Sequence, residues 1–364
     1  MMQRVLPYAL AYVYGVAVVV GVMFRGPFVW LPVILTFVVM PLLDATVGIS
    51  LWNPDPADET RLTNQRGYRF ITWAWVPFEA GAIAWALLVS IQPGTTWPER
   101  IGLAVGVGLM NGVVGITYAH ELIHQSNRFE RFLGDVLLAL ATYSHFRVEH
   151  VFGHHRHVAT PADPATARTG ETFYAFFARS VPGQLVSAWQ IEGERLRRQG
   201  LPIATPRNRM LQYAVFLVVL YAAIISATGA LGIAFFAVQS LVAFASLEIV
   251  NYIEHYGLRR ARKPDGRYET VRPAHSWNTG FRMSNWLLIN LARHSDHHAV
   301  ASRRFQILRA YDEAAAPVLP YGYATMYLLA LAPPLWFRVM QPRLHAWQAT
   351  SADSTLARVD MVRT

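Results

Sequence analysis

The stretch IGLAVGVGLMNGVVGITYAHELIH occupies residues 101–124 and decides the kind of fold this chain adopts. Most of it is apolar or small, and it is long enough to cross a bilayer as one helix, which takes about 20 residues. It ends in two histidines, His120 and His124, four positions apart. Side chains at this spacing lie on one helix face, about 5–6 Å apart. The stretch therefore predicts a membrane helix that presents two imidazoles at its end.

Five further stretches have the same apolar character. They run over about residues 5–24, 28–49, 70–91, 211–228 and 231–252. Together with 101–123 they predict an all-α fold, a polytopic membrane bundle of six transmembrane helices. The composition agrees, because 53% of the 364 residues are hydrophobic and 15% are charged, whereas soluble domains carry about 25% charged residues. No repeat or low-complexity linker interrupts the chain, so we expect a single domain over 1–364.

The orientation follows from the links between these stretches. The links after the first, third and fifth stretches are short and nearly uncharged, whereas residues 124–210 hold eleven arginines and 259–263 hold four more basic residues. The positive-inside rule assigns the basic links to the cytoplasm. We therefore expect a cytoplasmic cap from residues 124–210 and 253–345. This orientation accounts for the net charge of +9, and without a separate basic polar domain we expect no nucleic-acid partner.

The chain contains no cysteine. Disulfides, iron–sulfur clusters and thiolate metal sites are therefore excluded. Neither the dinucleotide-binding pattern G-x-G-x-x-G in a βαβ unit nor the phosphate-binding pattern G-x-x-x-x-G-K-[ST] is present. A redox function would have to use histidine, carboxylate or an organic cofactor, and would take its electrons from another protein.

Nine of the thirteen histidines gather in four motifs, and each motif falls on the predicted cytoplasmic side. The motifs are HELIH with His120 and His124, EHVFGHH with His150, His154 and His155, NYIEHYG with His255, and HSDHH with His294, His297 and His298. The predicted orientation rests on the basic links and not on the histidines. The location of all four motifs on one side of the membrane is therefore an independent observation. The other four, His145, His157, His275 and His345, stand outside these motifs.

The spacing of these histidines predicts two metal ions. On α-helices the pairs His120/His124, His150/His154 and His294/His298 would each aim both rings at one place. The adjacent pairs, 154–155 and 297–298, point about 100° apart on a helix and would serve two neighbouring ions. Nine imidazoles also exceed what one tetrahedral zinc can use. Imidazole suits zinc, copper, iron and nickel, and redox-inert zinc has little use for so many ligands, so we favour iron.

Charged residues beside the motifs suggest two supporting roles. Carboxylates could accept hydrogen bonds from ring N–H groups, and the candidates are Glu121, Glu149, Asp163, Glu254 and Asp296. Arg303, Arg304 and Arg309 follow HSDHH and could dock an acidic electron carrier, since long-range attraction raises encounter rates. In the alternative, these arginines face lipid phosphates or pair with carboxylates inside the cap.

At these motifs the chain resembles the membrane fatty-acid desaturase/hydroxylase superfamily, and more closely the alkane 1-monooxygenases. The resemblance rests on HELIH, EHVFGHHRHVATPADPATAR (149–168), NYIEHYGL (251–258) and RHSDHHA (293–299), with PLLDATVG (41–48) and SRRFQILR (302–309) in support. It covers residues from about 41 to about 345. It implies six transmembrane helices and a centre of two iron ions held by the nine histidines. Gln125 departs from the pattern, since a basic residue is commoner after HELIH.

The resemblance also implies a function. It implies a multi-pass protein of the bacterial inner membrane with its active site on the cytoplasmic side. The protein would hydroxylate the terminal carbon of medium- or long-chain alkanes to 1-alkanols with O₂. Its partners would be the apolar hydrocarbon, membrane lipid, and rubredoxin as electron donor, with a rubredoxin reductase upstream. Because cysteine is absent, we expect no fused rubredoxin domain.

Four alternatives are open. Relatives of the xylene monooxygenase type would hydroxylate aromatic methyl groups, and a lipid desaturase or hydroxylase could use the same scaffold. HELIH also fits the zinc protease pattern H-E-x-x-H, but that assignment leaves seven of the nine clustered histidines unexplained. A metal transporter would need ionisable residues along a path through the bilayer, where Glu79 and Glu248 are the exceptions among few.

Overall fold

The computed structural model describes residues 5–362, with residues 351–362 described as backbone only. Helices dominate this part of the chain, and within it β-structure is limited to three isolated bridges. Five helical segments are long and apolar enough to cross a membrane, namely Leu6–Phe24, Gly26–Val47, Arg66–Ser90, Trp97–Ile123 and Arg209–His255. The predicted all-α membrane fold is therefore confirmed.

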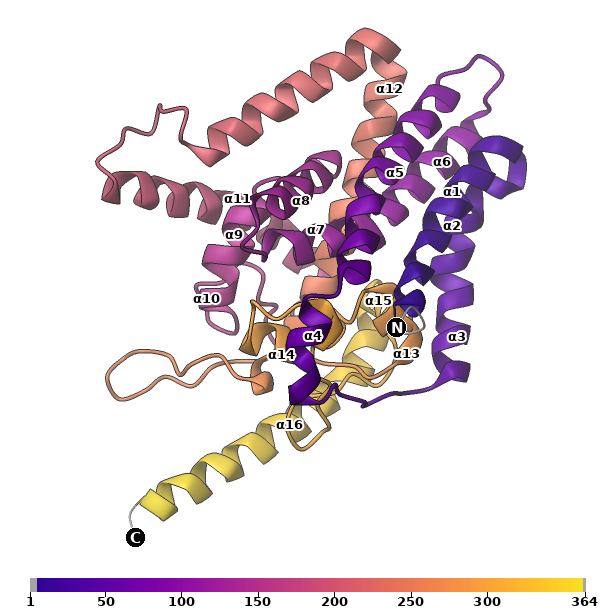
Figure 1. Cartoon of the computed structure of the whole chain (residues 1–364). Helices are drawn as coiled ribbons and strands as arrows, with labels where there is room; N and C mark the ends of the chain where they lie inside the picture. The colour runs from indigo at the N-terminus through magenta and orange to yellow at the C-terminus, as the bar shows by residue number, and fades with distance from the viewer. Residues whose placement is uncertain (1–4, 363–364) are drawn as a thin grey trace.

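The fifth segment, α12 (Arg209–His255), takes the place of two predicted helices. A straight helix of its 47 residues would measure about 70 Å, more than twice the roughly 30 Å core of a bilayer. It is not straight, because Gly229 has φ 65° and ψ −160° and the helix turns sharply near its middle (Figure 1). Glycine adopts positive φ without a steric penalty. The predicted fifth and sixth spans are thus the two arms of one bent helix.

The first four segments are built from shorter pieces. The first consists of a 3₁₀ turn (Leu6–Ala11) and α1 (Tyr12–Phe24), and the third is α5 (Arg66–Ser90) alone. The second runs through a 3₁₀ turn (Gly26–Trp30), α2 (Leu31–Ile34), a π-helical turn (Leu35–Val39) and α3 (Met40–Val47). The fourth runs through α6 (Trp97–Met110), a π-helical turn (Asn111–Gly115) and α7 (Ile116–Ile123). Such π-turns within helices are frequent at functional sites.

Small residues bring the fourth segment against the second arm of α12. A Cβ added at Gly112 would lie 2.7 Å from the Ala243 carbonyl oxygen and 2.8 Å from the Ser246 Cβ. Glycine at this position therefore lets the two backbones approach closely, as small residues do in membrane helix pairs. This packing holds the ends of α7 and α12 side by side, and it brings HELIH next to NYIEHYG.

The remaining elements form the cap. Between the fourth and fifth segments lie α8 (Arg128–Leu140), α9 (Phe146–Glu149), a π-helical turn (His150–His154), α10 (His155–His157) and α11 (Phe173–Arg198). After α12 come α13 (Arg282–Leu287), α14 (His294–Ala299), α15 (Tyr323–Ala330) and α16 (Pro333–Val362). Short pieces complete it, namely α4 (Glu59–Thr63) and 3₁₀ turns at Pro56–Asp58, Pro273–His275 and Phe305–Ile307. Of these, α4, α13 and α14 lie together at the lower end of the bundle (Figure 1).

Glu79 and Glu248, the two glutamates that a metal transporter could use, are buried in packing contacts. Glu248 in α12 accepts hydrogen bonds from Tyr143 (3.0 Å), Ser180 (2.9 Å) and Gln184 (2.8 Å), which joins α12 to α11. Glu79 accepts one from the indole of Trp75 on its own helix. These contacts give each glutamate a packing role within the bundle.

Candidate metal centre

The structure brings the nine motif histidines together at one end of the bundle, in two adjoining clusters. The five-histidine cluster consists of His120, His124, His150, His155 and His297, and the four-histidine cluster of His154, His255, His294 and His298. Within each cluster the ligand atoms all lie within 4.8 Å of one another. The other four histidines belong to neither. Four segments far apart in the sequence therefore meet here: the end of α7, the region from α9 to α10, the end of α12, and α14.

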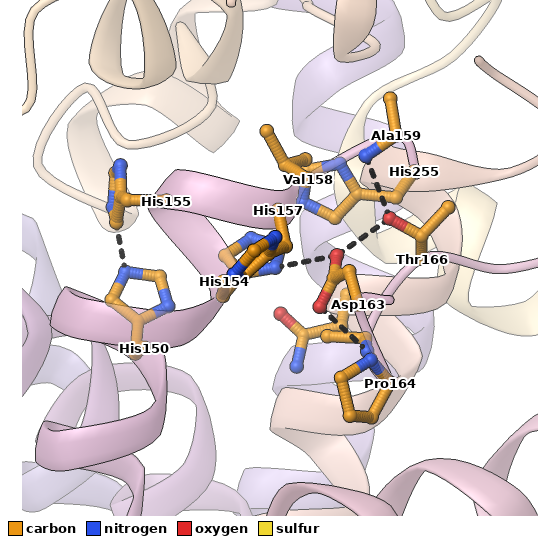
Figure 2. A network of polar contacts seen from close by, with 12 residues as sticks. His150, His154, His155, His157, Val158, Ala159, Asp163, Pro164, Thr166 and His255 are labelled. Atoms are coloured by element: carbon orange, nitrogen blue, oxygen red, sulfur yellow. Dashed lines mark hydrogen bonds and ion pairs between the residues drawn. The ribbon is translucent and has the colours of Figure 1, made fainter. Parts of the chain in front are cut away.

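A π-helical turn decides how the histidines of EHVFGHH are divided. We expected His150 and His154 to share an ion, but His150 lies in the five-histidine cluster with His155, while His154 lies in the other. Residues 150–154 form a π-helix, in which backbone bonds join residues five apart. The wider turn therefore brings residues five apart, rather than four, to one face. In Figure 2, His150 faces His155 and His154 points instead toward Asp163.

The other spacing arguments agree with the structure. His120 and His124, four apart at the end of α7, share a cluster, and so do His294 and His298 in α14. The adjacent pairs, 154–155 and 297–298, are each divided between the clusters. The His155 and His298 rings stack with centroids 4.5 Å apart, so the clusters are immediate neighbours.

The arrangement of the ring nitrogens in the five-histidine cluster fits a metal ion. The His150 Nε2 lies 2.7 Å from the His120 Nε2 and 3.0 Å from the His155 Nε2, although a neutral imidazole has a single N–H to donate. The His124 Nε2 is buried without any hydrogen-bond partner. Two nitrogens bound at about 2.1 Å to one ion, at a right angle, lie about 3 Å apart. Shared coordination thus accounts for contacts that hydrogen bonding alone leaves unsatisfied.

The protonation state of the rings also suits metal binding. Burial lowers the pKa of five cluster histidines well below the usual value, and the neighbouring histidines lower it further. These are His150, His155, His294, His297 and His298. A depressed pKa keeps an imidazole neutral at physiological pH, and the neutral ring is the form that binds metal.

Asp163 orients one of these rings. The Oδ2 atom of Asp163 lies 2.9 Å from the Nδ1 of His154 and accepts a hydrogen bond from the Thr166 hydroxyl (2.5 Å) (Figure 2). Its Oδ1 atom accepts one from the Ala165 backbone N–H (3.0 Å). Burial by itself would raise the pKa of Asp163, but His154 and these donors hold it below its usual range. A carboxylate on Nδ1 directs Nε2 toward the cluster and raises its basicity as a ligand.

We predict that Asp163→Asn weakens metal binding at the four-histidine cluster by about 10- to 100-fold, the usual effect of losing such a partner. Metal content after dialysis against a graded chelator measures the change. Asp135→Asn is the matched control, because Asp135 pairs with Arg147 and not with a cluster histidine. Equal retention of metal by the two variants would contradict the role assigned to Asp163.

Glu254 lies closer to the cluster than the sequence suggested. We expected it to accept from a far ring nitrogen, but its Oε2 is 3.1 Å from the His294 Nε2. That nitrogen also faces the Nε2 atoms of His255 (3.2 Å) and His298 (2.9 Å), so the carboxylate reaches the ligand side of the ring. Its other oxygen accepts a 2.6 Å hydrogen bond from the Tyr323 hydroxyl.

The other three candidate carboxylates contact side chains outside the two clusters. Glu121 accepts from Gln125 (2.9 Å), and Glu149 accepts from Ser187 (3.4 Å). Asp296 accepts from Arg303 (2.6 Å) and from the Tyr311 hydroxyl (2.8 Å). These contacts join the three carboxylates to side chains of the cap around the clusters.

The three arginines after HSDHH are paired inside the cap. Arg303 pairs with Asp296 (2.6 Å), Arg304 with Glu130 (2.8 Å) and Arg309 with Glu59 (2.5 Å). Their guanidinium groups are therefore engaged with carboxylates of this chain. This arrangement is the alternative to docking that the sequence left open.

An apolar cavity of about 50 Å³ lies between the spans. Residues of α1, α3, α12, α13, α15 and the π-turn after α6 line it. Two of these residues, Asp44 and Tyr323, were not among the predicted site residues. Asp44 accepts from the Ser284 hydroxyl (2.6 Å), and an aspartate within an apolar span was a signal that could have identified it. Tyr323 carried no such signal, because its importance comes from its contact with Glu254.

Comparison with known proteins agrees with this site. The fatty acid desaturase family model matches residues 95–330, which include all nine clustered histidines. Alkane 1-monooxygenase 2 of Pseudomonas aeruginosa is 43% identical over 322 residues, 88% of this chain and 85% of that protein. Alkane 1-monooxygenase of Acinetobacter baylyi is 39% identical over 313 residues, 86% of this chain and 76% of that protein.

A more distant similarity reaches the xylene/toluene monooxygenase hydroxylase component XylM of Pseudomonas putida. The identity there is 30% over 261 residues, 70% of this chain and 68% of that protein. The higher identity and the wider coverage favour the first group. The chain is thus an oxidoreductase of the alkane 1-monooxygenase family, within the fatty-acid desaturase/hydroxylase superfamily.

Proposed function

We propose that this protein is a non-haem di-iron monooxygenase that hydroxylates the terminal carbon of medium- or long-chain alkanes, using O₂ and electrons from rubredoxin. The observation that carries the proposal is the pair of adjoining clusters made of five and four histidines. The names of relatives at 39–43% identity supply the substrate class. The basic cap supports a location in the bacterial inner membrane with the clusters on the cytoplasmic side.

The chain's own residues would position the metals and exclude water. One iron in each cluster would supply the reductive activation of O₂ that hydroxylation of an unactivated carbon requires. Seven of the nine rings are buried and two are half-buried, so bulk water has little access to the reacting atoms. A site of this kind strengthens electrostatic interactions and prevents loss of reactive species to water.

The apolar cavity fits the reacting end of a linear hydrocarbon. It extends from Tyr14 and Thr36 on the first two spans to Ser284 and Tyr323. Tyr323 contacts Glu254, which in turn contacts the ring of His294, so the cavity ends beside the four-histidine cluster. A narrow passage admits an unbranched chain by its end, and it would hold the terminal carbon nearest to the metals.

We predict that Val113→Trp, which fills the cavity from the π-turn after α6, lowers hydroxylation of a medium-chain alkane at least about tenfold, since placement errors of 1 Å can cost about a hundredfold. Metal content should not change, because no clustered histidine lines this cavity. Product formation is measured by gas chromatography. Val219→Trp is the control, since Val219 is 62% exposed on the first arm of α12. Equal losses in the two variants would exclude this cavity as the substrate site.

A basic pocket of about 320 Å³ on the cap is a better place for the electron donor than the paired arginines. Asp163, the partner of His154, lines it, together with Arg168, Arg179 and Arg259. Arg168 and Arg259 are exposed, and their guanidinium groups make no ion pair among the described residues. An acidic donor bound there would lie two side chains from the four-histidine cluster.

We predict that Arg168→Glu and Arg259→Glu raise the KM for rubredoxin about tenfold and leave kcat at saturating rubredoxin unchanged, because reversing a charge at a docking surface mainly slows association. The effect should diminish as salt rises. Arg197→Glu, an exposed arginine near the far end of α11, is the control. If KM for the donor and its salt dependence match those of the unmodified protein, the donor docks elsewhere.

The proposal as a whole is tested by metal analysis of the purified protein followed by product identification. We expect about two irons per chain, and a 1-alkanol from a linear alkane supplied with O₂, rubredoxin and its reductase. Parallel assays with xylene and with a fatty acyl substrate distinguish the aromatic-methyl hydroxylase and the lipid desaturase. One zinc without iron would contradict the proposal.

A further inference from the structure

A second, larger pocket of about 350 Å³ is lined by none of the clustered histidines and by none of the residues that line the apolar cavity. Its wall includes the start of the first span (Pro7 and Tyr8), the start of α5 (Tyr68), and α13 with the turn that follows it. In the proposed orientation these are the cytoplasmic ends of the spans. The pocket therefore opens at the level of the inner-leaflet head groups, where tryptophan and tyrosine are common. Trp52 and Trp286 also line it.

The pocket carries positive charge without a matching carboxylate. Arg282 and Arg293 line it, and no aspartate or glutamate does. Arg293 is only 5% exposed, yet its guanidinium donates one hydrogen bond, to the Leu308 carbonyl (2.7 Å), and makes no ion pair among the described residues. A buried charge without a counter-ion is costly, so its persistence indicates a missing anionic partner.

The nearest carboxylate does not fill that role. Asp296 is three residues along the chain, but its oxygens accept from Arg303, the Tyr311 hydroxyl and the Arg309 backbone N–H.

Unsatisfied polar atoms gather around the same pocket. Among its lining residues, the Arg293 Nε, the Asn285 Oδ1 and the Gln306 Oε1 are buried without a hydrogen-bond partner. Unpaired buried polar atoms are uncommon and point to an absent partner. The first is a donor and the other two are acceptors. A ligand that satisfies all three needs an anionic oxygen and hydroxyl or N–H donors on one small group.

We propose that this pocket binds the head group of an anionic phospholipid of the phosphoglycerol type from the inner leaflet. The phosphate would lie against Arg282 and Arg293, the glycerol hydroxyls would donate toward Asn285 and Gln306, and the acyl chains would lie among the bilayer lipids. A phosphoethanolamine group brings an ammonium into a pocket that already holds two cations. A phosphocholine group has no N–H or O–H donor at all.

Bound lipid would also stabilise the neighbouring metal centre. Arg293 directly precedes the cluster residue His294, and Asn290 in the same turn donates to the Tyr8 hydroxyl (2.7 Å). A head group that joins Arg293 to the first span would hold α14 in place. Lipid binding itself does not depend on which metal the clusters hold or on the reaction they support.

The test uses the full-length protein, with lipid retention measured by native mass spectrometry and thermal unfolding measured in nanodiscs. The probes are palmitoyl-oleoyl phosphatidylglycerol, phosphatidylethanolamine and phosphatidylcholine. We expect one phosphatidylglycerol to be retained at least about tenfold better than phosphatidylcholine, with a higher midpoint of unfolding. Arg293→Gln should abolish the preference, and Arg282→Gln should reduce it several-fold. Arg128→Gln, an exposed cap arginine outside the pocket, should leave it unchanged.

Three results would each overturn the proposal. The first is equal retention of the three lipids, and the second is a preference for phosphatidylglycerol that survives both pocket substitutions. The third is stabilisation by inorganic phosphate in phosphatidylcholine nanodiscs equal to that by phosphatidylglycerol, which would mean that a free anion occupies the pocket. If Arg293→Gln does not fold, Arg282→Gln decides the matter, because Arg282 is exposed and is not next to a clustered histidine in the sequence.

Discussion

Replacing His150 by alanine is expected to reduce the purified protein from about two bound metal ions to about one and to lower alkane hydroxylation at least about a hundredfold. Loss of a partner outside the coordination shell already costs about 10- to 100-fold, so loss of a ligand should cost more. The Nε2 of His150 faces those of both His120 and His155, so its removal opens the centre of the five-histidine cluster. The four-histidine cluster should keep its metal.

Metal loss in a His154→Ala variant, compared with that in His150→Ala, tests the role of the π-helical turn. His154 belongs to the four-histidine cluster, so its variant should lose the other ion, and the double variant should lose both. On a regular α-helix the two rings would serve one ion, and the double variant would still hold one. His145→Ala is the control, because His145 is close in sequence but lies in neither cluster. Metal per chain by mass spectrometry distinguishes these outcomes.

Glu254→Ala is expected to weaken metal binding at the four-histidine cluster by about 10- to 100-fold or more and to abolish most hydroxylation. The carboxylate supplies negative charge at the Nε2 face of His294, within a cluster whose other known groups are neutral rings. Chelator titration followed by electron paramagnetic resonance of the remaining metal measures affinity and environment separately from activity.

Two milder variants resolve the role of this carboxylate. Glu254→Gln keeps an acceptor for the Tyr323 hydroxyl but removes the charge, so it should lose affinity nearly as much as alanine. Tyr323→Phe removes one hydrogen bond, worth about 1 kcal/mol, and should have an effect of about fivefold. Normal metal affinity in Glu254→Gln would show that the carboxylate only supports packing.

Local sequence patterns predicted the membrane helices and the histidine motifs, because these features depend on residues close together in the sequence. Apolar stretches of sufficient length predict membrane helices whatever surrounds them. Histidines at the ends of such helices are then restricted to one side of the bilayer. The nine histidines that the structure brings together are therefore the nine that the motifs contain.

The partners of the charged side chains could not be predicted, because they depend on contacts between segments far apart in the sequence. The charged residues beside the motifs could each have had several partners. Asp163 contacts His154, whereas Asp296 contacts Arg303 and Tyr311, and no spacing rule separates the two cases. Arg304 pairs with Glu130, which is 174 residues away in the sequence. This pairing is determined by the packing of α8 and not by the residues next to Arg304 in the sequence.

The sequence by itself determined the all-helical membrane fold and the set of histidines, since hydropathy and residue type act locally. Only the tertiary structure decided how those histidines divide into five and four. That division depends on a π-turn at residues 150–154, one wider turn of backbone, which rotates His154 away from His150 and places His155 beside it. The tertiary structure alone likewise places a buried arginine in a pocket without an anion, because both the burial and the missing partner arise from segments remote in sequence.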